Sequence, residues 1–148
     1  MGTFVEPLSA VSAAIVAALS DAAFLALCPG GAVDSVPQVE PTDANYPLLL
    51  YVVTNARQRG GLGSMPGRKT LPEIQILLHV YSLFQGMQQC QQVLGAAIDR
   101  LKTAPVVDGY SSWAIFWDSE TPLPNELLVG VTVQELVAQG RLYVEEAA

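Results

Sequence analysis

Two parts of the chain repeat apolar residues at the three- and four-residue spacing of an amphipathic helix. The first follows Pro7, a residue suited to the first turn of a helix, and its apolar positions are Leu8, Val11, Ile15 and Leu19. The second lies between Gly86 and Lys102, and its apolar positions are Met87, Cys90, Val93, Leu94, Ala97, Ile98 and Leu101. Each part predicts a helix with one apolar face.

A short helical turn is predicted directly after the first helix. Ser20-Asp21 contains residue types that cap helices, and Phe24 and Leu27 are expected to face inward. Pro29-Gly30-Gly31 cannot continue a helix, so the chain is expected to reverse there. A short strand is predicted over Val33–Val39.

Two long strands are predicted in the middle of the chain. Tyr46–Asn55 is continuously apolar and rich in β-branched residues, which is typical of a central strand covered on both faces. Glu73–Tyr81 alternates instead, with Ile74, Ile76, Leu78 and Val80 on one face and Gln75, Leu77, His79 and Tyr81 on the other. We expect these two strands to form a hairpin.

Further strands are predicted towards the C-terminal side. Tyr110–Asp118 alternates and places Trp113, Ile115 and Trp117 on one face. Pro122-Leu123-Pro124 indicates a corner, Leu127–Val137 a second strand, Gly140 a bend and Leu142–Val144 a final short strand.

The order of elements is helix, strands, helix, strands, with one apolar stripe on each helix. Two helices packed on one face of a mostly antiparallel sheet bury these stripes most economically, so we predict an α+β fold with a long hairpin arm. A length of 148 residues suits one domain, and we assign residues 1–148 to a single domain.

The predicted arm is a basic, glycine-rich segment between the two middle strands. It carries Arg57, Arg59, Arg68 and Lys69, which are four of the seven Lys and Arg residues of the chain, and two apolar residues, Leu62 and Met65. Connections of about a dozen residues inside a compact domain are commonly functional or disordered. Arg and Met are favoured at interfaces. We therefore interpret the arm as a partner-contact segment, with a solvated loop as the alternative.

Composition points to assembly with other chains. Hydrophobic residues make up 51% of the sequence and charged residues only 14%, against about 25% charged in an ordinary soluble domain. Apolar surface in excess is most simply buried against other copies or partners. Outside the arm, three Lys and Arg face 14 Asp and Glu, a formal charge of −11, which argues against general adhesion to nucleic acid.

Residues able to carry chemistry are few. His79 is the single histidine, and Cys28 and Cys90 are expected to be buried free thiols, so a Cys-His enzyme using Cys90 is a weak alternative. Asp118 and Glu120 are interpreted as solvated strand-end carboxylates rather than an acid pair or cation site. We expect no enzyme activity, no metal and no cofactor.

The apolar stretch Leu8–Cys28 could be mistaken for a membrane or export segment. No Lys or Arg precedes it, and it is rich in Ala and contains Asp21, which is costly in hydrocarbon. We therefore predict an amphipathic helix packed on a sheet and no membrane association.

Several of these features together resemble the tail-completion, or tail-terminator, proteins of long-tailed bacteriophages. The likeness rests on the Ala-rich opening Val11–Leu27, the Tyr46-Pro47 entry into an apolar strand, the loop that follows, and the strand Gln75–Ser82 before a helix.

The resemblance implies a virion structural protein of the tail or neck, assembled in the host cytoplasm. It implies a homo-oligomeric ring, typically hexameric, on the last ring of the tail-tube protein, which ends tube growth and presents a surface to the head-side connector or stopper. DNA would pass through the lumen without specific binding, which suits an acidic body. Another head-tail joining or tail-tube component is the alternative in this class.

Overall fold

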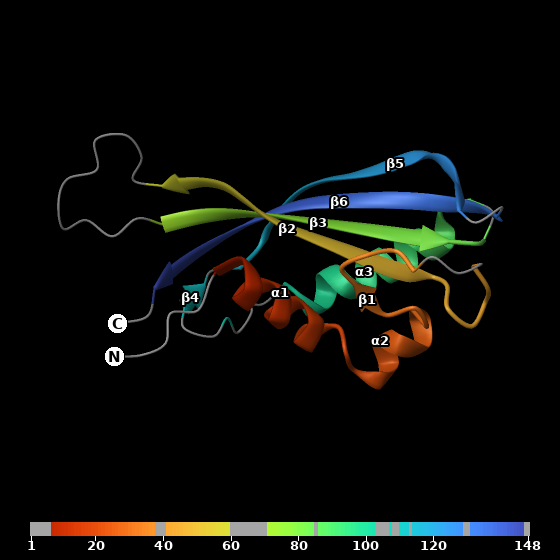
Figure 1. Cartoon of the computed structure of the whole chain (residues 1–148), viewed down its shortest axis with the longest axis horizontal. Helices are drawn as coiled ribbons and strands as arrows, with labels where there is room; N and C mark the ends of the chain where they lie inside the picture. Colours follow the sequence, from red (N-terminus) through yellow and green to blue (C-terminus); the bar gives the residue numbers. More distant parts are fainter. Residues whose placement is uncertain are drawn as a thin grey trace.

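The computed structural model describes residues 7–37, 41–59, 71–84, 86–102, 107, 110–112, 114–128 and 131–146. These residues form a sheet of six strands: β1 (Ala32–Val33), β2 (Leu48–Arg59), β3 (Leu71–Ser82), β4 (Tyr110–Ser112), β5 (Phe116–Leu128) and β6 (Val131–Glu146). They lie in the order β1, β2, β3, β6, and the far edge of β6 pairs with both β5 and β4 (Figure 1). Among the pairs of described strands, only β1–β2 is parallel. The α+β prediction is confirmed.

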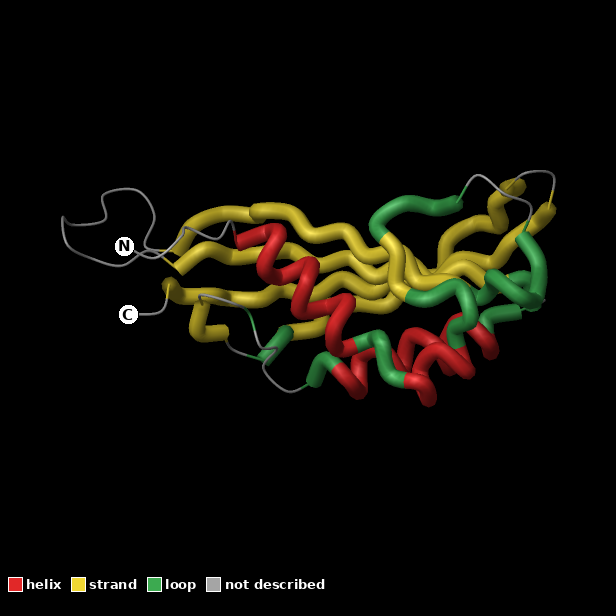
Figure 2. The backbone as a smooth tube through the Cα atoms, turned by 60° about the horizontal axis from the view of Figure 1, so that its bottom comes forward, coloured by secondary structure: helices red, strands yellow, loops and turns green. Residues whose placement is uncertain are grey.

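The helices formed by the described residues, three in number, cover one face of this sheet (Figure 2). They are α1 (Pro7–Ala18), α2 (Ala22–Leu27) and α3 (Gln88–Arg100). The core between the two layers contains Ile15 of α1, Phe24 of α2, Leu94 of α3, Ile76 of β3 and Ala138 of β6. The apolar stripes predicted for the first and last of these helices are therefore the faces that they bury.

The short helix after α1 has the predicted cap and the predicted end at Leu27, but one of its two residues expected to face inward is exposed. The Asp21 carboxylate accepts a hydrogen bond from the Phe24 backbone N–H at 3.2 Å, which caps α2. Phe24 is fully buried, but Leu27 is 46% exposed, so its predicted inward orientation is wrong. The predicted strand Val33–Val39 contracts to Ala32–Val33, and residues 38–40 lie outside the described part of the chain.

The β2–β3 hairpin extends beyond its predicted limits. Its register runs from Leu48 opposite Tyr81 to Arg59 opposite Leu71, with one irregularity after Asn55. The first three residues of the predicted arm are thus part of β2, and residues 60–70 connect the two strands at the far end of the hairpin.

The C-terminal strands required the largest corrections. The predicted strand Tyr110–Asp118 divides into β4 and the start of β5, and the predicted corner at Pro122 lies inside β5. Pro is tolerated there because β5 pairs along one edge with β6 and its register shifts between Leu123 and Glu126.

Gly140 does not bend the chain, because β6 continues through it to Glu146. A Cβ atom at Gly140 would lie 2.8 Å from Trp117 Cε3 and 2.9 Å from Ile115 Cγ2. Glycine is therefore required at this position for close packing across two strands.

Candidate assembly surface

Of the six residues predicted to contact a partner, two lie at the far end of the hairpin and four are outside the described residues. Arg57 and Arg59 occupy the last positions of β2. Leu62, Met65, Arg68 and Lys69 fall outside the described residues.

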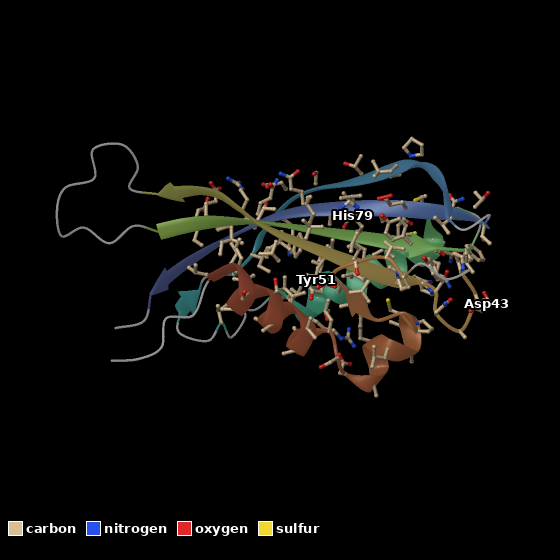
Figure 3. All side chains as sticks on the ribbon, in the orientation of Figure 1. Asp43, Tyr51 and His79 are labelled. Atoms are coloured by element: carbon tan, nitrogen blue, oxygen red, sulfur yellow. The ribbon has the colours of Figure 1, made fainter. Side chains whose placement is uncertain are left out.

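The side of the sheet opposite the helices is not covered by any described helix, and we call it the helix-free face. The strand register places Leu50, His79 and Val137 side by side on this face. Val52, Leu77 and Gln139 form the next row. These side chains are all only partly buried. In Figure 3, His79 projects to this face, whereas Tyr51 projects towards the helices.

A buried carboxylate lies beneath this face. Glu135 is 2% exposed, and its Oε1 lies 2.9 Å from His79 Nδ1, whose side chain is 20% exposed. The His79 ring also stacks on Tyr81, with 6.4 Å between ring centroids. Glu135 Oε2 has no hydrogen-bond partner among the described residues. The sequence reasoning missed Glu135, although a carboxylate between Val133 and Val137 in an alternating strand was a usable signal.

Further along the face, a cluster of polar side chains links three strands by hydrogen bonds and ion pairs. Arg141 of β6 binds Asp118 of β5 with two hydrogen bonds of 3.1 Å, and its Nη1 lies 3.5 Å from Glu73 Oε1 of β3. Tyr143 donates to Glu73 Oε1 at 3.0 Å. Asp118 is therefore the partner of a guanidinium, and among the described residues no group of three or more His, Cys, Asp or Glu could hold a metal ion.

Both cysteines are buried free thiols, as predicted. Burial raises the pKa of each thiol to about 11, so neither ionises near neutral pH. Cys90 packs on the helix side, where its thiol donates to the Val80 carbonyl at 3.6 Å, while His79 projects from the other side. The sheet separates the two groups of the Cys-His alternative.

Outside the predicted arm, every Lys and Arg of the chain has an acidic partner. Arg100 donates two hydrogen bonds to Asp21, of 2.7 and 2.9 Å, and these bonds lower the pKa of Asp21 to about 2. Lys102 Nζ lies 3.4 Å from Asp99 Oδ1, and Arg141 is paired with Asp118 as described above. The described cations of the body are therefore all engaged within the chain.

None of the helices formed by described residues is long and apolar enough to cross a bilayer. The apolar stretch Leu8–Cys28 contributes to two helices, α1 and α2, that pack on the sheet.

The fold is shared with a component of a virus-like particle. A chain in a structure described as the virion of a native gene transfer agent particle matches with a TM-score of 0.72 and 15% sequence identity. The match covers 96% of this chain and 99% of the other. At this identity the likeness concerns the fold alone. Among curated protein sequences, none matches the chain.

The family is defined by the sequence itself. The profile of the family described as tail completion protein gp17 matches residues 13–133, and the chain belongs to that family. This confirms the resemblance drawn from the helix, strand and loop pattern. Membership places the chain among the structural proteins of phage tails.

Proposed function

We propose that copies of this chain form a closed ring, six in number, that caps the phage tail tube. The ring ends tube polymerisation and presents a surface to the head-side connector or stopper. The observation that carries this proposal is the family match over residues 13–133. The protein acts through its surfaces and carries out no reaction of its own.

The helix-free face supports burial against other protein. Its two rows contain four partly buried apolar side chains, Leu50, Val52, Leu77 and Val137, which form a group rather than isolated apolar residues on a surface. Covering it with a neighbouring protomer would remove it from water without disturbing the helix-covered core.

The charge distribution supports passage of DNA through the ring. Excluding residues 57–69, the chain has a formal charge of −11, and its Lys and Arg are held by carboxylates. Binding to phosphates requires free cations that displace counterions. A lumen lined by this body would let DNA pass without retaining it.

Electron microscopy of phage that lack this protein tests the position of the ring. Loss of a terminator gives overlong tails, because tube polymerisation no longer stops. Tailless heads beside tails of normal length would instead assign the protein to head-tail joining and contradict the capping proposal.

The arm gives a sharper test. Deleting residues 60–67 shortens the connection between β2 and β3 and leaves both strands intact. We expect a folded protein, with the circular dichroism spectrum of the wild type, that fails to cap tails. Tails of normal length from this variant would show that the segment is a solvated loop.

A further inference from the structure

A small depression lies at the end of the molecule opposite the end of the hairpin. It has a volume of about 220 Å³ and is lined by Phe84, Gln88, Gln89 and Gln92. Ligand pockets for small molecules are usually about 300–1,000 Å³ and mostly enclosed by apolar side chains. A depression of this size with an amide-rich lining suits one or two side chains of a protein partner.

The lining of the depression is held in place from below. The buried hydroxyl of Ser82 donates a hydrogen bond to Gln89 Oε1 and accepts one from the Phe84 backbone N–H at 3.0 Å. Phe84 is nevertheless 52% exposed. An exposed aromatic ring on a fixed backbone, beside amides that can hydrogen-bond to a peptide, has the character of an anchor at a protein interface.

We infer that this depression receives the segment 57–69 of a second copy of the chain, with Met65 or Leu62 placed against Phe84. The inference rests on the proposed self-assembly and names its contact surface. A Met thioether packs favourably on an aromatic ring. The glycines at positions 60, 61 and 63 allow the backbone to approach the Gln amides closely.

The segment cannot reach the depression of its own chain. β3 runs from Leu71 to Ser82, eleven steps of about 3.3 Å, so the depression lies about 35 Å from the end of the hairpin. The middle of an 11-residue connection is at most six residues from either strand, a reach of about 20 Å even when fully extended. A contact between these two surfaces must therefore join different copies.

Charge favours the same pairing. The segment carries four cations, and the Lys and Arg of the described body are already paired with carboxylates. Asp43 is exposed at the end of the molecule that holds the depression and forms no ion pair with a described residue (Figure 3). The end of the hairpin, to which the segment is joined, and the depression lie at opposite ends of the protomer. Repeated contacts of this head-to-tail kind generate a ring when the rotation closes.

Disulfide trapping tests the contact directly. Full-length chains carrying Met65→Cys are mixed with chains carrying Gln88→Cys and oxidised. We expect a disulfide-linked dimer in the mixture and little in either sample alone, because a disulfide requires Cα atoms within about 7 Å. Asp99→Cys is the matched control, since Asp99 is also exposed on α3 but lies about 16 Å further along the helix.

A second measurement uses self-association without added cysteines. Phe84→Ala should weaken association by about tenfold or more, as expected for an aromatic anchor, whereas Phe116→Ala, which removes another exposed ring, should leave it nearly unchanged. Native mass spectrometry and sedimentation report both.

The outcomes separate this inference from the proposed ring. Oligomers that form normally but give no Met65→Cys to Gln88→Cys crosslink, or crosslink equally well through Asp99→Cys, overturn the inference and leave the ring standing. Crosslinking of the segment to a tail-tube protein in place of a second copy also overturns it. A wild-type chain that stays monomeric both alone and on purified tails contradicts the ring as well.

Discussion

The contact between His79 and Glu135 allows a quantitative test of how the helix-free face is stabilised. Glu135 is only 2% exposed, and its Oε1 forms a hydrogen bond of 2.9 Å with His79 Nδ1. His79→Phe keeps an aromatic ring beside Tyr81 but removes this donor, which leaves a buried carboxylate without a partner. Removing one partner of a buried polar pair costs more than removing both.

We expect His79→Phe to lower the free energy of unfolding by about 2–4 kcal/mol. For a chain of this size, this corresponds to a fall in Tm of about 5–15 °C. Glu135→Met, which removes the carboxylate at similar volume, should cost less than about 1.5 kcal/mol. The double variant should then be close in stability to Glu135→Met, because no carboxylate remains to be left unpaired.

Urea unfolding of the four proteins at one pH gives the coupling energy of this double-mutant cycle. His79→Gln serves as a control, since its amide can still donate to Glu135 and should recover part of the lost stability. The reasoning is refuted if His79→Phe costs less than about 0.5 kcal/mol or if the two single effects simply add, because contact residues in a hydrogen-bonded pair are expected to couple.

Three further predictions follow from the packing and the ion pairs. Gly140→Ala should destabilise the protein by about 1–3 kcal/mol, because the new Cβ must displace the ring of Trp117. Gly95→Ala on α3, where a Cβ meets nothing within 4 Å, should instead stabilise the protein by about 0.5–1 kcal/mol. Thermal unfolding of both variants measures these two effects. The pKa of Asp21 is held near 2 by Arg100, so the stability that this carboxylate contributes is present above its unfolded pKa of about 3.9 and is lost as the pH falls towards 2. Asp21→Asn should accordingly be less stable than the wild type at pH 6 and approach it at pH 2. Both cysteine thiols, with pKa values of about 11, should resist iodoacetamide at pH 8 in the folded protein and react rapidly in urea; fast labelling without denaturant would show that the core opens.

Features set by local pattern could be predicted from the sequence. The pattern between Gly86 and Lys102 predicts a helix because its apolar residues repeat within one element, and α3 lies within these limits. The β2–β3 hairpin is predictable because two neighbouring segments both favour strands. The opposite orientations of His79 and Val80 follow from alternation alone. The α+β class then follows from the order of these elements.

Features set by contacts between distant residues could not be predicted. Gly140 indicated a bend when considered locally, but its role depends on the position of Trp117 in a strand more than 20 residues earlier. Pro122 indicated a corner because the shifted register of β5 on β6 is invisible in the sequence. The pairing of Asp118 with Arg141 likewise depends on which two strands become neighbours.

The place of β6 in the sheet also has a consequence for synthesis on the ribosome. β6 follows the other described strands in the sequence, yet it pairs with β3 along one edge and with β5 and β4 along the other. During translation the edge of β3 therefore remains unpaired until the final strand emerges, and an unpaired strand edge is a template for aggregation. Because its pairing with β3 spans about 60 residues of sequence, sheet closure is a slow, late step of folding. A nascent chain that stalls before β6 would expose the unpaired edge of β3 to the chaperones of the host cell.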